Sequence, residues 1–313
     1  MTIEPTTAAA PRRDRWWSRF LVRGVFWRQF LRWAVLNVPS WLEPVVMASW
    51  SLFFLLWGPG RRGVMLNLSA IKPGSHAIAN FVRTFAVFWN YAWTIADNVR
   101  FQELGTVPDW EFRGARHFES LQATDGGAIL LTAHMGSYDL GAHLFSNYSQ
   151  RKIVMIRAPE VDPETRQYEE SMHGRHSDNL RIDFSSRTSE LAFELLSEVR
   201  SGNIVAIQGD RVTPGIASMT TTLFGKSVQL PAGPFALAMA AGVPIYPLFV
   251  MRAGRRRYRL LTSPPFHVTR KSRDRDEDLA EAMARWTKEL EAVIASSWYQ
   301  WFTFEPYSPE LAR

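Results

Sequence analysis

The sequence contains no cysteine among its 313 residues. This absence excludes structural disulfides, thiolate nucleophiles and zinc sites with cysteine ligands. A long apolar run is also missing from the N-terminal region, because the uncharged stretch 44–57 is shorter than the roughly 20 residues of a membrane-spanning helix. We therefore expect this stretch to form a buried or partly inserted helix.

Several common signatures of nucleotide and hydrolase sites are absent as well. There is no G-x-S-x-G elbow and no G-x-G-x-x-G fingerprint, which disfavours a serine hydrolase and a dinucleotide oxidoreductase. Gly225-Lys226-Ser227 does not complete a P-loop, because the position five residues before Gly225 is Thr220 rather than glycine. His173, His176 and Asp178 lack a further placed ligand, so we predict no metal site.

The composition that is present describes a globular protein with an anionic partner. Apolar residues make up 46% of the chain, and the net charge is +6 with a pI near 9.8. Membrane headgroups, nucleic acid or a phosphorylated carrier would each satisfy this charge. Residues 15–36 interleave tryptophan and arginine, which favours an interfacial membrane helix over the alternative of a surface helix covering the domain.

Short apolar runs alternate with helix-sized segments in most of the remaining chain. Strands are predicted at 110–114, 128–132, 152–156, 204–207 and 243–251, with a hairpin around a basic turn at 252–260. Helices are predicted at 78–99, where aromatic residues recur at helical spacing, and at 117–123, 189–200 and 274–298. This alternation predicts an α/β fold with a mainly parallel central sheet flanked by helices. We expect a disordered leader at 1–14, an aromatic and basic membrane-associating helical region at 15–105, and an α/β catalytic domain at 106–313.

Three predicted strands deliver charged residues to one edge of the sheet. The first is followed by His134 and Asp139, the next by Arg157, and the third by Asp210 and Arg211. Carboxyl ends of parallel strands are where open α/β sheets place their sites. A histidine held by a carboxylate is a general-base arrangement, although a capped histidine without chemistry and a salt bridge closing the strand edge are the alternatives.

The same residues carry a resemblance to a known family. The run from His134 to Asp139 is similar to an H-x(4)-D/E motif, and it is followed by Gly209-Asp210-Arg211, Leu223-Phe224-Gly225, Gly233 and Pro244. In this order the pieces resemble the bacterial lipid A biosynthesis acyltransferases, and the fold expected is glycerolipid-acyltransferase-like. The resemblance implies transfer of an acyl group from an acyl carrier protein or coenzyme A thioester to a hydroxyl or amine of a membrane lipid. It also implies a location at the cytoplasmic face of the bacterial inner membrane, with no metal or other cofactor.

On this basis the sequence predicts a role for each candidate residue. His134 removes the proton of the acceptor, and Asp139 stabilises the imidazolium that forms. Substrate phosphate is assigned to Arg157, Arg211 or Lys226, with Asp210 orienting an arginine or touching the acceptor. Backbone N–H groups near Gly136 or Gly233, the latter at a predicted helix start, are candidates for the oxyanion site.

Two other classes of function remain open at this point. A membrane-surface scaffold without catalysis explains the Trp/Arg region but not the charged strand ends. A nucleic-acid-binding protein explains the pI, yet the basic residues cluster with tryptophan and no binding module is visible. The aromatic end of the chain, 298–304, is interpreted as packing.

Overall fold

A computed structural model describes residues 25–149, 151–157, 179–184, 188–213 and 215–312. The predicted leader, the first part of the Trp/Arg segment and the loop with His173, His176 and Asp178 lie outside the described residues. Among the residues that are described, no helix has both the length and the apolar character needed to cross a bilayer.

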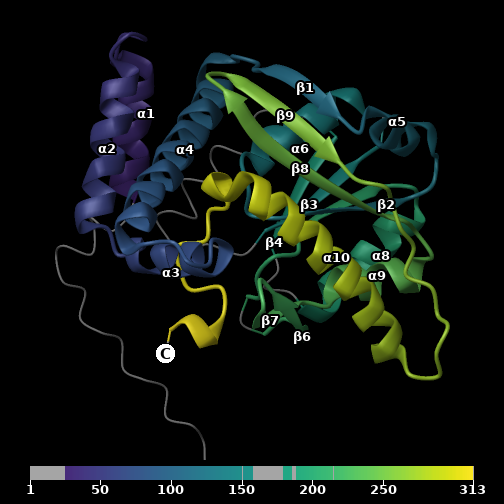
Figure 1. Cartoon of the computed structure of the whole chain (residues 1–313). Helices are drawn as coiled ribbons and strands as arrows, with labels where there is room; N and C mark the ends of the chain where they lie inside the picture. The colour runs from purple at the N-terminus through teal and green to yellow at the C-terminus, as the bar shows by residue number, and fades with distance from the viewer. Residues whose placement is uncertain (1–24, 150, 158–178, 185–187, 214, 313) are drawn as a thin grey trace, which may run out of the picture.

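A seven-stranded sheet forms the centre of the molecule, in the order β1-β9-β8-β2-β5-β3-β4 (Figure 1). Five neighbouring strands run parallel to one another: β8 (Ile245–Gly254), β2 (Ala128–Thr132), β5 (Ile204–Gln208), β3 (Ile153–Arg157) and β4 (Leu180–Phe184). β9 (Arg257–Thr262) is antiparallel to β8, and β1 (Asp109–Arg113) is parallel to β9. The predicted α/β class with a mainly parallel sheet is confirmed.

The middle strand β2 shows why the sheet must be covered on both sides. Its sequence, Ala-Ile-Leu-Leu-Thr, is buried at every position. Ile129 and Leu131 point to one face of the sheet and Ala128 and Leu130 to the other, as the two-residue period of a strand requires. A strand that is apolar on both faces is stable only between two helical layers.

The two layers come from different parts of the chain. One face carries α9 (Gly233–Ala241), α10 (Arg275–Ser297), α8 (Thr188–Arg200) and the antiparallel pair β6 (Ser218–Leu223) and β7 (Lys226–Pro231). The opposite face carries α5 (Ala115–Ala123) and α6 (Tyr138–Tyr148). In Figure 1, α10 crosses in front of the sheet and is continuous with the C-terminal segment that ends near α3.

Sequence reasoning missed three strands. β4, β6 and β7 are not fully buried, and β6 contains three consecutive threonines rather than an apolar run. Each is stabilised by pairing with a neighbour, β3 for β4 and one another for β6 and β7. A search for apolar runs does not detect strands of this kind.

The N-terminal helices pack beside the sheet with a core of their own. They are α1 (Val25–Asn37), α2 (Glu43–Trp57), α3 (Arg61–Ile71) and α4 (Ala77–Leu104). The core lies between α1, α2 and α4, and α3 packs against α4 and the C-terminal segment. α4 ends at Gly105, which adopts the left-handed conformation favoured by glycine after a helix. The other end of the chain joins this group, because the ring of Phe304 stacks on that of Phe88. The C-terminal segment therefore bridges the helical region and the sheet.

Candidate active site

His134 lies two residues beyond the end of β2, in a turn that leads into α6. Its side chain is 30% exposed. α6 then begins after Ser137, whose hydroxyl caps the helix by accepting from the N–H of Leu140 and donates to Oδ1 of Asn98 at 2.7 Å. The turn thus holds a partly exposed histidine between a buried strand and a capped helix.

The carboxylate that faces His134 is Asp210. Oδ1 of Asp210 is 2.7 Å from Nδ1 of His134 and accepts a second hydrogen bond, 3.1 Å long, from the backbone N–H of His134. The register of the sheet explains this pairing. Thr132 of β2 is opposite Gln208 of β5, and His134 and Asp210 each lie two residues after these paired positions. Adjacent parallel strands therefore bring the imidazole and the carboxylate together.

This arrangement corrects the prediction that Asp139 orients His134. Asp139 is in the first turn of α6, where its Oδ1 forms an ion pair with the guanidinium of Arg157 at the end of β3. The H-x(4)-D spacing places both residues on the same turn, but the carboxylate is directed towards β3. Arg157 therefore binds a protein carboxylate, in addition to any role towards a substrate.

Asp210 is fully buried and ionised. Burial by itself would raise the pKa of the Asp210 carboxyl. The charge and hydrogen bond of His134, the charge of Arg211 and the indole N–H of Trp301 together outweigh burial and hold this pKa below its usual range. An ionised carboxylate only accepts hydrogen bonds, so Nδ1 of His134 carries the proton. In the neutral ring the basic lone pair is then on Nε2.

The backbone N–H of Gly136 is not available for an oxyanion. It donates to the carbonyl of Gln300 at 3.0 Å, and the N–H of Ser137 donates to the carbonyl of Val250 at 2.9 Å. Gly136 has φ +53°, and a Cβ at this position would lie 1.8 Å from the carbonyl oxygen of Val250. The glycine is required for close backbone packing.

The remaining predicted substrate-binding residues are spread over a wider area. Arg211 donates from Nη2 to the carbonyl of Phe302 at 3.0 Å and to Oγ1 of Thr303 at 3.3 Å. Lys226 pairs with Glu310 at 3.5 Å, beside the C-terminal 3-10 turn η3 (Pro309–Leu311), and Gly233 is the first residue of α9. Within the described part of the chain, neither Lys226 nor Gly233 has a hydrogen bond or ion pair with His134 or Asp210.

Sequence reasoning missed Trp301, which follows the 3-10 turn η2 (Trp298–Gln300). Its indole N–H donates to Oδ2 of Asp210 at 2.9 Å. The aromatic end of the chain is therefore more than packing. No local signal marks Trp301 among its aromatic neighbours, because its partner lies 91 residues earlier in the sequence.

Comparison with known families agrees with this geometry. The family model described as bacterial lipid A biosynthesis acyltransferase matches residues 77–307. The chain belongs to this family. It is an acyltransferase, and family membership implies a lipid acceptor and an acyl donor. No curated protein matches the chain.

The acyltransferase match includes α4, the whole sheet and the aromatic C-terminal segment. His134, Asp210 and Trp301 all fall within it. Among the described residues, no group of three histidine or acidic side chains is arranged to hold a metal ion.

Proposed function

We propose that the enzyme transfers a fatty acyl group from an acyl thioester to a hydroxyl or amine of a membrane lipid, with His134 as the general base. The donor is an acyl carrier protein or coenzyme A thioester. The observation that carries this proposal is the pairing of the partly exposed imidazole of His134 with the buried, ionised carboxylate of Asp210. A partly exposed base held in one tautomer, with its basic lone pair on Nε2, is suited to activate a nucleophile.

The reaction balances with these two residues alone. Nε2 of His134 takes the proton of the acceptor O–H or N–H as the acceptor atom bonds to the thioester carbonyl carbon. The carbonyl electrons move to oxygen, and they return as the carbon–sulfur bond breaks. The departing thiolate then takes the proton from His134. Asp210 stabilises the imidazolium between these steps and remains ionised.

Binding of the substrates falls to cations around the same edge of the sheet. Arg157 is the last residue of β3, and Arg211 lies three residues beyond the end of β5, so both are at this edge. Each is already held by protein atoms, Arg157 by Asp139 and Arg211 by the C-terminal segment, so their guanidinium groups are positioned before a substrate arrives. We assign them to a phosphate of the acceptor or of the donor arm, since arginine is suited to bidentate contacts with phosphate.

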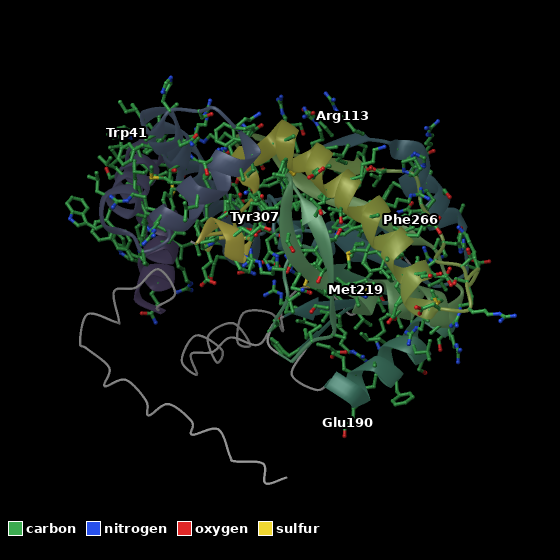
Figure 2. All side chains as sticks on the ribbon, turned by 60° about the horizontal axis from the view of Figure 1, so that its bottom comes forward. Trp41, Arg113, Glu190, Met219, Phe266 and Tyr307 are labelled. Atoms are coloured by element: carbon green, nitrogen blue, oxygen red, sulfur yellow. The ribbon has the colours of Figure 1, made fainter. Side chains whose placement is uncertain are left out.

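We also propose that the enzyme works at an anionic membrane surface, at the cytoplasmic face of the bacterial inner membrane. Exposed apolar side chains gather on the N-terminal helices and their connection, namely Trp33, Leu36, Trp41, Val45, Leu52, Phe53, Leu56 and Trp57. Figure 2 shows Trp41 at the outer edge of these helices. The basic turn between β8 and β9 adjoins them, because Arg255 donates to the carbonyl of Ser40 and pairs with Glu43. Apolar residues beside arginines suit an interface with anionic lipid.

Transfer of a labelled acyl group to total membrane lipids tests the proposed function. Acyl carrier protein and coenzyme A thioesters are supplied separately, and the labelled product is identified by mass. His134→Ala is compared with His267→Ala, because His267 is exposed and is outside the site. We expect His134→Ala to lower the rate by about 10²- to 10⁴-fold, the usual contribution of a general base.

The control should retain the wild-type rate at equal folded amount. A wild-type rate that survives His134→Ala would show that another group is the base. No transfer from either thioester would contradict the proposed class of donor.

A further inference from the structure

The C-terminal segment 300–303 runs antiparallel to the loop that carries His134. Met135 and Trp301 form an isolated β-bridge. The N–H of Phe302 donates to the carbonyl of His134 at 2.8 Å, and the N–H of Gly136 donates to the carbonyl of Gln300 at 3.0 Å. The catalytic loop is therefore paired with the C-terminal segment by backbone hydrogen bonds on both sides of Met135.

Gln300 fastens the same segment to β8. Its side-chain amide donates to the carbonyl of Arg252 at 2.8 Å, and its Oε1 accepts from the N–H of Arg252 at 2.7 Å. Arg211 holds the other end of the segment through the carbonyl of Phe302. Trp301, between these two anchors, is almost completely buried. The position of Trp301 is thus fixed by the anchored residues before and after it in the sequence.

The indole N–H of Trp301 completes the surroundings of the Asp210 carboxylate. Oδ1 accepts from the ring and the backbone of His134, while Oδ2 accepts from Nε1 of Trp301 at 2.9 Å. An indole N–H can donate a hydrogen bond but cannot accept one. It therefore favours the ionised carboxylate and prevents its rotation, so that Oδ1 stays directed at Nδ1 of His134.

We infer that Trp301 is a positioning residue, which acts on the base His134 through Asp210. This inference rests on the proposed general-base role of His134. Burial alone would suggest that Trp301 only packs in the core, whereas the inference gives it a role in catalysis. The substrate is not expected to touch Trp301, because this side chain is almost completely buried in the protein.

Trp301→Phe tests the inference, because it removes the N–H and keeps an aromatic side chain. We expect kcat to fall by about 10- to 100-fold, the size of effect expected for a hydrogen bond to a charged group, with KM for the acceptor changed by less than about threefold. A fall in kcat without a change in KM is the result expected for a residue that orients the base and does not touch the acceptor.

A double-mutant cycle separates positioning from general damage. In the Asp210→Ala background, Trp301→Phe should change kcat by no more than about twofold, because the group through which it acts is gone. The matched control is Trp50→Phe. Trp50 is also buried, but its indole N–H has no partner among the described residues. Trp50→Phe should leave kcat and KM unchanged.

If Trp301→Phe does not fold, 3-benzothienylalanine at position 301 removes the N–H while preserving the size of the ring. Losses of the two single variants that multiply in the double variant, or a rise in KM that accounts for the lost activity, would overturn the inference. Either result is distinct from failure of the proposed function, in which the wild-type enzyme shows no His134-dependent transfer at all.

Discussion

At the scale of single residues, each carboxylate near the catalytic loop is distinguished by its partner. Asp139 pairs with Arg157 and Asp210 with His134. Sequence reasoning identified all four residues, because charged groups directly after buried strands are conspicuous. It could not assign the pairs. Pairing depends on which strands are neighbours, and β2 lies beside β5 rather than beside β3, the next strand in the chain.

The depressed pKa of Asp210 leads to a prediction about stability and pH. The carboxyl has a lower pKa in the folded protein than the value of about 3.9 in an unfolded chain. Ionised Asp210 therefore stabilises the fold above that value, and this contribution is lost as the pH falls towards the folded pKa. Asp210→Asn lacks it, so the difference in unfolding free energy between wild type and variant should shrink from pH 5.5 to pH 3. Urea unfolding at several pH values measures this difference.

The same variant should be a poor enzyme at every pH. An amide cannot accept at both of its ends, so it cannot bind the ring of His134 and the indole of Trp301 as the carboxylate does. We expect kcat to fall by about 10³-fold or more. The exposed pair of Lys271 and Glu281 supplies a control, because Glu281→Gln should change neither the activity nor the pH dependence of stability. A difference between wild type and Asp210→Asn that is independent of pH would contradict the assignment of Asp210 as ionised.

At the scale of secondary structure elements, the long periodic helices and the apolar strands were predictable from sequence. α10 is observed at Arg275–Ser297 and was predicted at 274–298, and the predicted hairpin at the basic turn is β8–β9. The aromatic stripe of the predicted helix 78–99 is part of the core between α4 and its neighbours. The attachment of α2 was not predictable. It depends on Glu43, whose partners are spread over α4 and the β8–β9 turn.

Glu43 joins the N-terminal helices to the sheet through a buried cluster of charges. Its carboxylate is buried and pairs with Arg100, which is also buried, and with Arg255 and Arg256. Asp97 continues the cluster by pairing with Arg252 and accepting from the hydroxyl of Tyr258 at 3.0 Å. Burial raises the pKa of Asp97 despite the nearby arginines. Two carboxylates face four arginines in this cluster, so loss of either carboxylate leaves positive charge uncompensated.

Glu43→Gln should therefore destabilise the protein by roughly 3 kcal/mol, because the buried guanidinium of Arg100 loses a charged partner. Glu281→Gln, which breaks an exposed pair, should cost less than about 1 kcal/mol. Thermal or chemical unfolding of the two variants beside the wild type measures both values. Equal small shifts would mean that the Glu43 cluster contributes no more than a surface ion pair.

At the scale of the whole molecule, the sequence predicted the layers and the edge of the sheet that carries the site. The alternation of apolar runs and helices contains that information, because buried parallel strands must be joined by helices. It contained no information on the C-terminal segment, which returns from α10 to pair with the catalytic loop. That contact joins residues far apart in the chain, and no periodicity records it.

The distribution of exposed apolar residues leads to the last prediction, which concerns membrane binding. Trp57 is 71% exposed on α2, and Phe193 is 76% exposed on α8, away from the N-terminal helices. If the N-terminal helices form the membrane face, Trp57→Ser should weaken binding to vesicles containing anionic lipid by about tenfold, because burial of one large apolar side chain is lost. Phe193→Ser removes a similar exposed ring and should leave the binding unchanged.

Vesicle flotation at 0.1 M and 0.5 M salt measures the binding of both variants. The wild type should bind less at the higher salt, because the arginines of the β8–β9 turn are then screened. Equal effects of the two substitutions would show that binding does not depend on the N-terminal face.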